Sequence, residues 1–133
     1  MLKIAELKAG DIIKVNDEGV EREGTVVEIS HEEHQALVDN GIQEFWYTQE
    51  EMSPIPVSEE HLQKLGFEKE DTAEGGVKYK KGAFRLLLPQ KGNFSHIEMW
   101  YREDRRHFDF PLNVHQLQNL HLQMTKVPLD QPL

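Results

Sequence analysis

The chain has 133 residues, no cysteine and a formal net charge of −9, with 29% charged and 38% hydrophobic residues. Without cysteine, disulfides, thiolate metal sites and cysteine nucleophiles are excluded, and the composition is that of a globular protein able to bury a core. No apolar run resembles a signal peptide or approaches the roughly 20 residues of a membrane span. We therefore expect a cytoplasmic protein that does not bind membranes.

The charge is divided unevenly along the sequence. Residues 1–57 contain four basic and thirteen acidic side chains, whereas residues 58–133 contain eleven of each. This divide predicts two structural units, residues 1–57 and residues 58–133. A strongly negative first unit favours basic partners and disfavours long polyanions such as nucleic acids.

Short apolar and β-branched runs separated by turn residues indicate that residues 1–57 form a small all-β unit. Asn40-Gly41 is a strong hairpin signal because both residues tolerate the positive φ angles of a tight turn. We expect strands over residues 11–15, 24–29, 35–38 and 43–48.

The order of these segments follows a known pattern. Ala9-Gly10-Asp11-Ile12-Ile13 and Gly24-Thr25-Val26-Val27-Glu28-Ile29 resemble the first and second strands of SH3-like barrels. Residues 49–52 stand where such barrels have a short helical turn, and residues 53–57 where they have a last strand. The resemblance implies that residues 1–57 form an acidic SH3-like barrel.

Helix signals stand at both ends of residues 58–133. Ser58 is a good N-cap for a helix over 59–65, and Gly66 is a good C-terminal stop. Asn113 and Gln116 form a capping box for a helix over 113–124. Between the helices we expect a flexible loop over 68–76, a charged turn over 103–106 and strands over 76–79, 83–88, 95–102 and 107–110.

The predicted fold class is therefore α+β. An N-terminal SH3-like small β-barrel precedes a four-stranded antiparallel sheet with two helices, so that residues 58–133 form an α-β-β-β-β-α unit. On the last helix we expect His121 to pack against the sheet and both His115 and Gln118 to be exposed. The tail from Lys126 is expected to be loose.

Two segments carry a more specific resemblance. They are Pro54-Ile55-Pro56-Val57-Ser58-Glu59-Glu60-His61-Leu62, continuing to Leu65-Gly66-Phe67, and Val114-His115-Gln116-Leu117-Gln118-Asn119-Leu120. Both resemble a family of short uncharacterised proteins from Bacteroidota genomes and their prophages, although His121-Leu122-Gln123 replaces an aromatic run of that family. The family brings no activity and no catalytic residue. The resemblance implies a non-enzymatic accessory protein of mobile-element origin.

Two groups of residues are candidates for binding a partner. Trp46 and Tyr47, beside the Asn-Gly turn, could form an aromatic groove for a basic peptide; the alternative is that one packs in the core. Residues 76–106 contain eight basic and three acidic side chains, and an aromatic on a basic sheet suits single-stranded nucleic acid. The alternative is that these cations are neutralised by the acidic half. The second group comprises Trp100, Arg102, Arg105 and Arg106.

The sequence holds no motif typical of an enzyme. His31-Glu32-Glu33-His34 lacks the four-residue histidine spacing of zincins, and His115 and His121 are too far apart around a helix to share an ion. We expect no catalytic residue, no metal and no cofactor. The predicted function is a protein-interaction or adaptor module with an unidentified basic protein partner, with self-association as an option. Nucleic-acid binding through residues 76–106 is the alternative.

Overall fold

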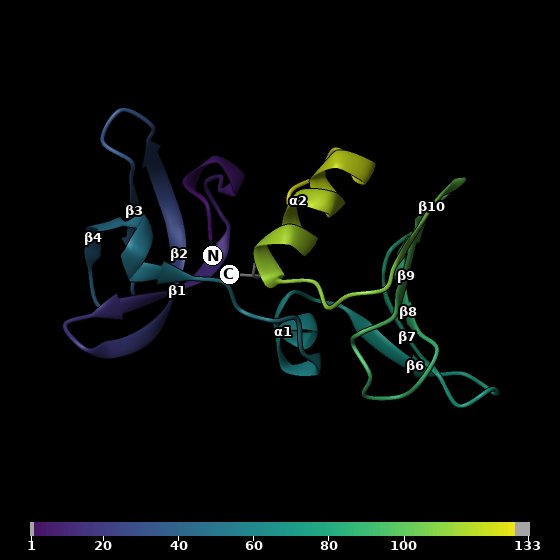
Figure 1. Cartoon of the computed structure of the whole chain (residues 1–133). Coiled ribbons are helices and arrows are strands. Elements are labelled where there is room, and N and C mark those ends of the chain that lie inside the picture. Colours follow the sequence, from purple (N-terminus) through teal and green to yellow (C-terminus); the bar gives the residue numbers. More distant parts are fainter. Residues whose placement is uncertain (1, 130–133) are drawn as a thin grey trace. The chain divides into compact units, whose positions relative to one another are not determined.

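The computed structural model describes residues 2–129, which divide into two compact units. Unit 1 contains the described residues up to Ile55 together with Asn113–Gln116, and unit 2 contains Pro56–Leu112 together with the described residues from Leu117. The C-terminal helix therefore starts in unit 1 and continues in unit 2. The α+β class is confirmed: ten strands form two antiparallel sheets accompanied by two α-helices (Figure 1).

Unit 1 is a curled antiparallel sheet with the strand order β4-β3-β2-β1-β5. β5 returns to pair with β1, and η2 precedes it, which is the arrangement expected from the SH3-like pattern. The last strand is shorter than expected and ends before Pro54, because proline cannot donate a ladder hydrogen bond. The elements are η1 (Ile4–Glu6), β1 (Ile12–Asp17), β2 (Val20–Ser30), β3 (Gln35–Asp39), β4 (Glu44–Thr48), η2 (Gln49–Glu51) and β5 (Met52–Ser53).

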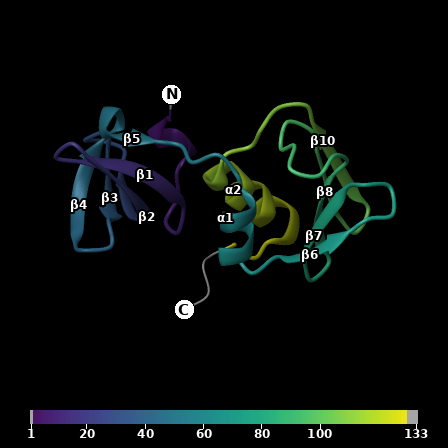
Figure 2. The same cartoon turned by 90° about the horizontal axis from the view of Figure 1, so that it is seen from below.

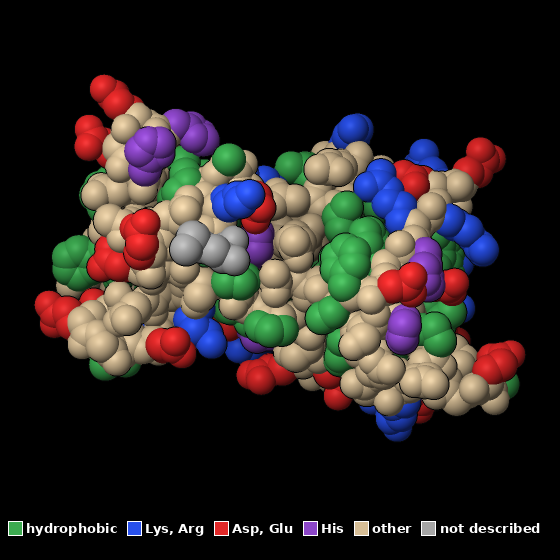
Figure 3. All heavy atoms as spheres, viewed as in Figure 1, with side chains coloured by type: hydrophobic (Ala, Val, Ile, Leu, Met, Phe, Trp, Pro, Cys, Tyr) green, Lys and Arg blue, Asp and Glu red, His purple; other side chains and the backbone are tan. Residues whose placement is uncertain are grey.

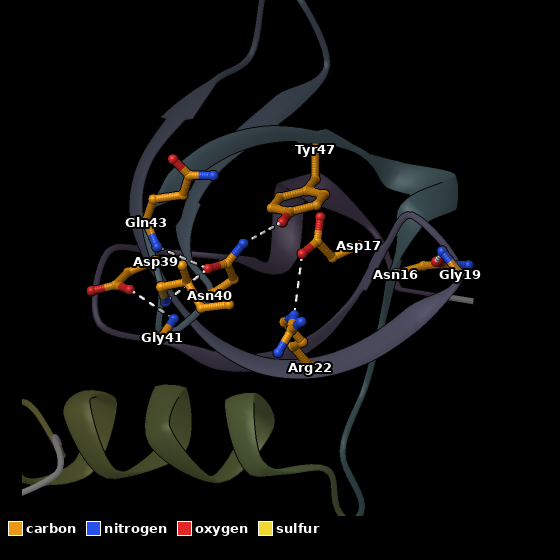
Figure 4. Close-up of polar contacts among 10 residues, drawn as sticks. Asn16, Asp17, Gly19, Arg22, Asp39, Asn40, Gly41, Gln43 and Tyr47 are labelled. Atoms are coloured by element: carbon orange, nitrogen blue, oxygen red, sulfur yellow. Dashed lines mark hydrogen bonds and ion pairs between the residues drawn. The ribbon is translucent and has the colours of Figure 1, made fainter.

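Two hairpin turns of unit 1 follow from local chemistry. Glu18 and Gly19 both have positive φ, and Asn16 Oδ1 accepts a hydrogen bond from the Gly19 N–H at 2.8 Å. In the second turn, Asn40 Oδ1 accepts from two backbone N–H groups and Asn40 Nδ2 donates to the Tyr47 hydroxyl at 2.9 Å (Figure 4). The Asn-Gly prediction is confirmed, and Asn40 ties the turn to the interior of the curled sheet.

The core of unit 1 lies inside the curl of the sheet. A bulge between Val26 and Glu28 bends β2 where it pairs with β3, and such bulges increase strand curvature. This curvature lets the inward side chains of five strands meet those of the N-terminal segment. The buried cluster comprises Leu2, Ile4, Leu7, Ile13, Val15, Val26, Ala36, Val38, Tyr47 and Met52.

Unit 2 is a five-stranded meander with the order β10-β9-β8-β7-β6. In both views, α1 and α2 lie on the same side of this sheet (Figures 1 and 2). Phe84 of the sheet contacts the Phe67 ring at 6.0 Å and the His121 ring at 4.7 Å between centroids. The elements are α1 (Glu59–Lys64), β6 (Glu68–Asp71), β7 (Val77–Lys81), β8 (Phe84–Leu88), β9 (Ile97–Tyr101), β10 (Asp104–Phe108) and α2 (Val114–Thr125).

The predicted helix caps are confirmed. Ser58 Oγ accepts from the His61 N–H at 3.3 Å, and Gly66 has φ 91° while the Phe67 N–H donates to the Leu62 carbonyl at 3.0 Å. The latter is the hydrogen bond of a Schellman stop. At the start of α2, Gln116 Oε1 accepts from the Asn113 N–H at 2.9 Å, as a capping box requires.

Two predictions about the second sheet are wrong. Residues 68–71 form strand β6 rather than part of a loop, which gives the sheet five strands instead of four. The charged turn is only Arg102-Glu103, and β10 begins at Asp104. Both strands lie at an edge of the sheet and are rich in charged side chains, so the sequence pattern did not indicate them. An edge strand needs only backbone pairing on one side, and its charges prevent further strands from adding.

Three predictions about the last helix and its tail are also wrong. His115 is 1% exposed, Gln118 is fully buried, and Leu129 in the supposedly loose tail is fully buried. Gln118 Nε2 donates to the Leu129 carbonyl at 2.9 Å, so the amide anchors the tail instead of facing solvent. His121 does pack against the sheet as expected. Residues 130–133 of the predicted tail lie outside the described residues.

Candidate functional site

The side of the second sheet that faces away from the helices carries a basic and aromatic surface. Along β7, β8 and β9, buried residues alternate with more exposed ones. The helix-facing set includes Val77, Leu86 and Met99, so the alternate positions point the other way. We call this surface the Trp100 face, and define it by Lys78, Arg85, Leu87, Glu98, Trp100, Arg105 and His107.

Trp100 stands at the centre of this face because of the strand register. On one side it pairs with Arg85 of β8, and on the other with Arg105 of β10. The guanidinium carbons of Arg85 and Arg105 lie 5.7 and 5.6 Å from the indole centroid, and Lys78 Nζ lies 5.8 Å from it. Three cations from three strands therefore surround one tryptophan, at distances typical of cation–π contacts.

These three cations have no carboxylate partner among residues 2–129. By contrast, Lys80 pairs with Glu70 at 3.3 Å, and Arg106 pairs with Asp104 at 3.2 Å. Arg85 and Arg105 are exposed and Lys78 is half-buried. The positive charge around Trp100 is thus available to an anionic ligand, whereas the charges of Lys80 and Arg106 are already compensated.

Two hollows flank the centre of the Trp100 face, and both are lined by Leu87, Glu98 and Trp100. The smaller, of about 210 Å³, extends toward Arg105 and His107. The larger, of about 500 Å³, extends toward Lys78 and the turn after β6. Flat ligands can therefore lie on either side of Trp100 while contacting the same carboxylate.

A histidine–carboxylate group borders the smaller hollow. His107 Nε2 lies 2.7 Å and His96 Nδ1 3.2 Å from Asp109 Oδ1. The hydrogen bond from His107, followed by that from His96, lowers the pKa of Asp109 below its usual value. His107 Nδ1 also lies 4.0 Å from a Glu98 oxygen. His107 is therefore fixed between two carboxylates at the edge of the face.

The structure separates the predicted residues of the basic group. Arg105 contacts Trp100 as a cross-strand neighbour, whereas Arg102 lies in the turn after β9 and is not part of the Trp100 face. Arg102 adopts φ 57° in the β9–β10 turn, and its guanidinium carbon lies 5.1 Å from the Tyr101 ring centroid. Arg106 alternates to the opposite side of β10, where it pairs with Asp104 and reaches the smaller hollow only at its rim.

The predicted aromatic pair of unit 1 is separated as well. Tyr47 is 4% exposed and its hydroxyl accepts from Asn40, so it belongs to the core. Trp46 is 44% exposed and borders a shallow hollow of about 420 Å³ whose other lining residues are Glu28, Ser30, Glu33 and Gln35. Figure 3 shows many carboxylates over the strands of unit 1, whereas cations gather beside β10 of unit 2.

The histidine motif of unit 1 lies in an exposed turn between β2 and β3, where His34 has φ 55°. Within residues 2–129 no group of three or more histidine or acidic side chains is placed to hold a metal ion. In the same part of the chain, neither helix is long and apolar enough to cross a membrane.

Comparison with known proteins adds no relative: no family model, curated protein or solved structure matches this chain. The resemblance to prophage-associated proteins therefore remains a prediction.

Sequence reasoning missed five members of the Trp100 face as site residues, namely Lys78, Arg85, Leu87, Glu98 and His107. Lys78 and Arg85 contribute to the local excess of charge, but their convergence on Trp100 depends on the register of β7, β8 and β9. Glu98 was treated only as an opposing charge. Strand alternation could have identified Glu98 as a site residue. Glu98 and Trp100 are two residues apart in one strand, so both side chains lie on the same face of the sheet.

Proposed function

We propose that this protein is a non-enzymatic binding module of the cytoplasm, and that the Trp100 face binds single-stranded nucleic acid. The observation that carries the proposal is the group of three cations without carboxylate partners around Trp100. Proteins that bind single strands combine cations, which contact phosphates, with aromatic rings, on which bases stack. The Trp100 face supplies both within one layer of side chains.

The present cation–π contacts do not oppose this function. Arg85 and Arg105 are exposed long side chains, and a cation–π contact at such a site contributes only about 0.5–1 kcal/mol. A base stacked on tryptophan contributes about 1–3 kcal/mol, and a phosphate gives each guanidinium a charge-assisted hydrogen bond. The cations can therefore move from the indole ring to phosphates when a base arrives.

The net charge of −9 slows the association of nucleic acid with the protein more than it weakens the contacts at the Trp100 face. At an ionic strength of 0.1 M, exposed charges more than about 10 Å apart are largely screened. Contacts at the face act within a few ångströms and are screened much less. Long-range repulsion by unit 1 is thus compatible with binding at physiological salt concentrations.

Fluorescence anisotropy of a labelled single-stranded (dT)9 oligonucleotide tests the proposal. The (dT)9 oligonucleotide should bind. A plot of the logarithm of the association constant against the logarithm of the salt concentration should have a slope of about −2, because about three phosphates are neutralised. Arg85→Glu/Arg105→Glu should abolish binding, and Trp100→Ala should weaken it about tenfold or more, since each stacked base contributes about 1–3 kcal/mol.

The matched control is Lys3→Glu/Lys64→Glu, which makes the same change in net charge at exposed positions that are not part of the Trp100 face. This variant should bind (dT)9 nearly as well as the unmodified protein. Equal loss of affinity in both double variants, or displacement of (dT)9 by polyglutamate with no effect of Trp100→Ala, would show only non-specific attraction of anions.

A second candidate function is the adaptor role expected from the acidic unit. The hollow beside Trp46, with Glu28 and Glu33 in its lining, supports binding of a basic protein segment, because an aromatic ring and carboxylates both attract cations. A lysine- and arginine-rich peptide should then bind, and Glu28→Gln/Glu33→Gln should weaken it at least several-fold in isothermal titration calorimetry. Unchanged affinity in this variant would rule the hollow out as the peptide-binding site.

The mobile-element origin implied by the sequence resemblance is compatible with both proposed ligands, single-stranded nucleic acid and a basic protein segment.

A further inference from the structure

We infer that the Trp100 face selects guanine among the bases, and that Glu98 is the residue that determines this selectivity. The inference rests on the proposed function, because it names the base that the same site prefers. The Glu98 carboxylate stands in the middle of a surface that is otherwise suited to phosphates, and this position needs an explanation.

Glu98 is placed where it meets the edge of a stacked base. It lies two residues before Trp100 on β9, on the same side of the strand, so the two Cα atoms are about 7 Å apart. Both side chains line both hollows. A base stacked on the indole therefore directs one edge along β9 toward the carboxylate.

A carboxylate discriminates among the bases because it only accepts hydrogen bonds. Guanine alone offers two adjacent donors, N1–H and the N2 amino group, on its Watson–Crick edge. Cytosine and adenine offer one amino donor next to a ring acceptor, and thymine or uracil offers one N–H between two carbonyl oxygens. An ionised Glu98 can thus bind guanine with two hydrogen bonds, while each other base brings a lone pair toward it.

A second residue of the smaller hollow complements the other edge of guanine. Arg105, which has no carboxylate partner among residues 2–129, lines this hollow together with Glu98. Beside a guanine, Arg105 can donate to the O6 and N7 acceptors in place of a phosphate, which is the commonest base contact of arginine. A donor group and an acceptor group thus line one hollow beside Trp100, and the polarity of guanine matches both.

The neighbours of Glu98 leave its carboxylate available. His107 Nδ1 is 4.0 Å away, beyond hydrogen-bond distance, while His107 Nε2 contacts Asp109 at 2.7 Å. Leu87, the cross-strand neighbour in β8, is apolar. Since Glu98 repels phosphates without binding a cation at close range, reading a base is the role that fits its position.

The experiment compares (dT)9 with three oligonucleotides in which the central thymine is replaced by guanine, adenine or cytosine, measured by anisotropy. A single guanine also avoids the self-association of guanine-rich strands. We expect the guanine oligonucleotide to bind about tenfold more tightly than (dT)9, the size of effect that one bidentate contact gives. Glu98→Gln should remove most of this preference and improve binding of the adenine oligonucleotide, because glutamine pairs with adenine through one donor and one acceptor.

The outcomes separate this inference from the proposed function. If all four oligonucleotides bind equally, or if the guanine preference persists in Glu98→Gln, the inference is wrong while the proposed function stands. If none of them binds at 50 mM salt, the proposed function fails and the inference with it. An unchanged thermal midpoint of Glu98→Gln confirms that this exposed substitution leaves the fold intact.

Discussion

At the scale of single residues, buried polar groups decide where the two aromatic candidates of unit 1 belong. Trp46 and Tyr47 are adjacent aromatic residues, but only tyrosine carries a hydroxyl. The Tyr47 hydroxyl accepts a hydrogen bond from Asn40 Nδ2 at 2.9 Å. Asn40 in turn holds the β3–β4 turn through its Oδ1. Tyr47 therefore contributes to stability, and Trp46 is left to contact solvent or a ligand.

Replacing Tyr47 with phenylalanine should destabilise the protein. The change leaves the buried Asn40 amide without its acceptor, which costs about 1–3 kcal/mol. Urea denaturation measures the loss. Tyr101→Phe is the matched control, because no described hydrogen bond involves the Tyr101 hydroxyl, and we expect a change below about 0.5 kcal/mol. Equal effects of both substitutions would contradict the assigned role of Tyr47.

His115 poses a different problem, since both of its ring nitrogens are buried without a hydrogen-bond partner in the described part of the chain. The nearest carboxylate oxygen, from Glu6, lies 3.5 Å from Nε2. A buried imidazole whose nitrogens make no hydrogen bond costs free energy that an apolar side chain of similar size does not.

We therefore expect His115→Leu to stabilise the protein by about 1 kcal/mol at pH 7.5, measured by urea denaturation. His31→Leu, at an exposed position, serves as the control for added hydrophobicity. A clear loss of stability in His115→Leu would instead show that the contact between His115 and Glu6 stabilises the folded protein.

At the scale of elements, α1 is attached to the sheet through its first acidic residue. Glu59 Oε1 lies 2.7 Å from Lys69 Nζ of β6 and accepts from the Tyr79 hydroxyl of β7 at 3.1 Å. The hydrogen bond from Lys69, followed by that from Tyr79, lowers the pKa of Glu59 below 4.5. Burial and the same carboxylate raise the pKa of Tyr79 to about 12.

This contact predicts a dependence of stability on acid. Because the pKa of Glu59 is lower in the folded protein, its contribution is complete above about pH 4.5 and is lost as the pH falls through the lowered pKa. Glu59→Gln should therefore lose less stability than the unmodified protein between pH 6 and pH 3. Glu60→Gln is the control, because Glu60 pairs within α1 with Lys64. If Glu59→Gln and the unmodified protein lose stability equally, the contact contributes nothing.

The elements that could be predicted from the sequence are those whose signals are local. Ser58, Gly66 and Asn40-Gly41 determine caps and turns through their own backbone and side-chain chemistry, and all three predictions hold. The strands β6 and β10 were missed or misplaced because their residues are charged, and their pairing depends on a partner strand. Strand pairing is a non-local property that hydrophobic periodicity does not report.

At the scale of the whole molecule, the uneven charge along the sequence favoured unit 1 as the binding surface, whereas the placement of individual cations favours the Trp100 face. A net charge counts every side chain, but binding depends on which charges lack a partner. In unit 2 the acidic residues pair at the margins of the sheet, as Glu70 does with Lys80. Cross-strand register meanwhile collects three cations without carboxylate partners around Trp100.

The candidate site was thus only partly accessible to sequence reasoning. Trp100 and Arg105 were identified from local charge and aromatic content, whereas Lys78, Arg85 and Glu98 required the pairing of four strands. His115 and Gln118 were placed in solvent because polar residues usually lie there. Their burial depends on contacts with Glu6 and Leu129, which are remote in sequence.

The chain has two tryptophans, and they report on the two candidate surfaces separately. The most direct test of the account is a nitrogen–proton correlation spectrum, in which each indole N–H gives one signal, assigned through Trp46→Phe and Trp100→Phe. Adding the single-stranded oligonucleotide with one central guanine should shift or broaden the Trp100 signal and leave the Trp46 signal unchanged. A shift of the Trp46 signal alone, or of neither signal at saturating oligonucleotide, would contradict binding at the Trp100 face.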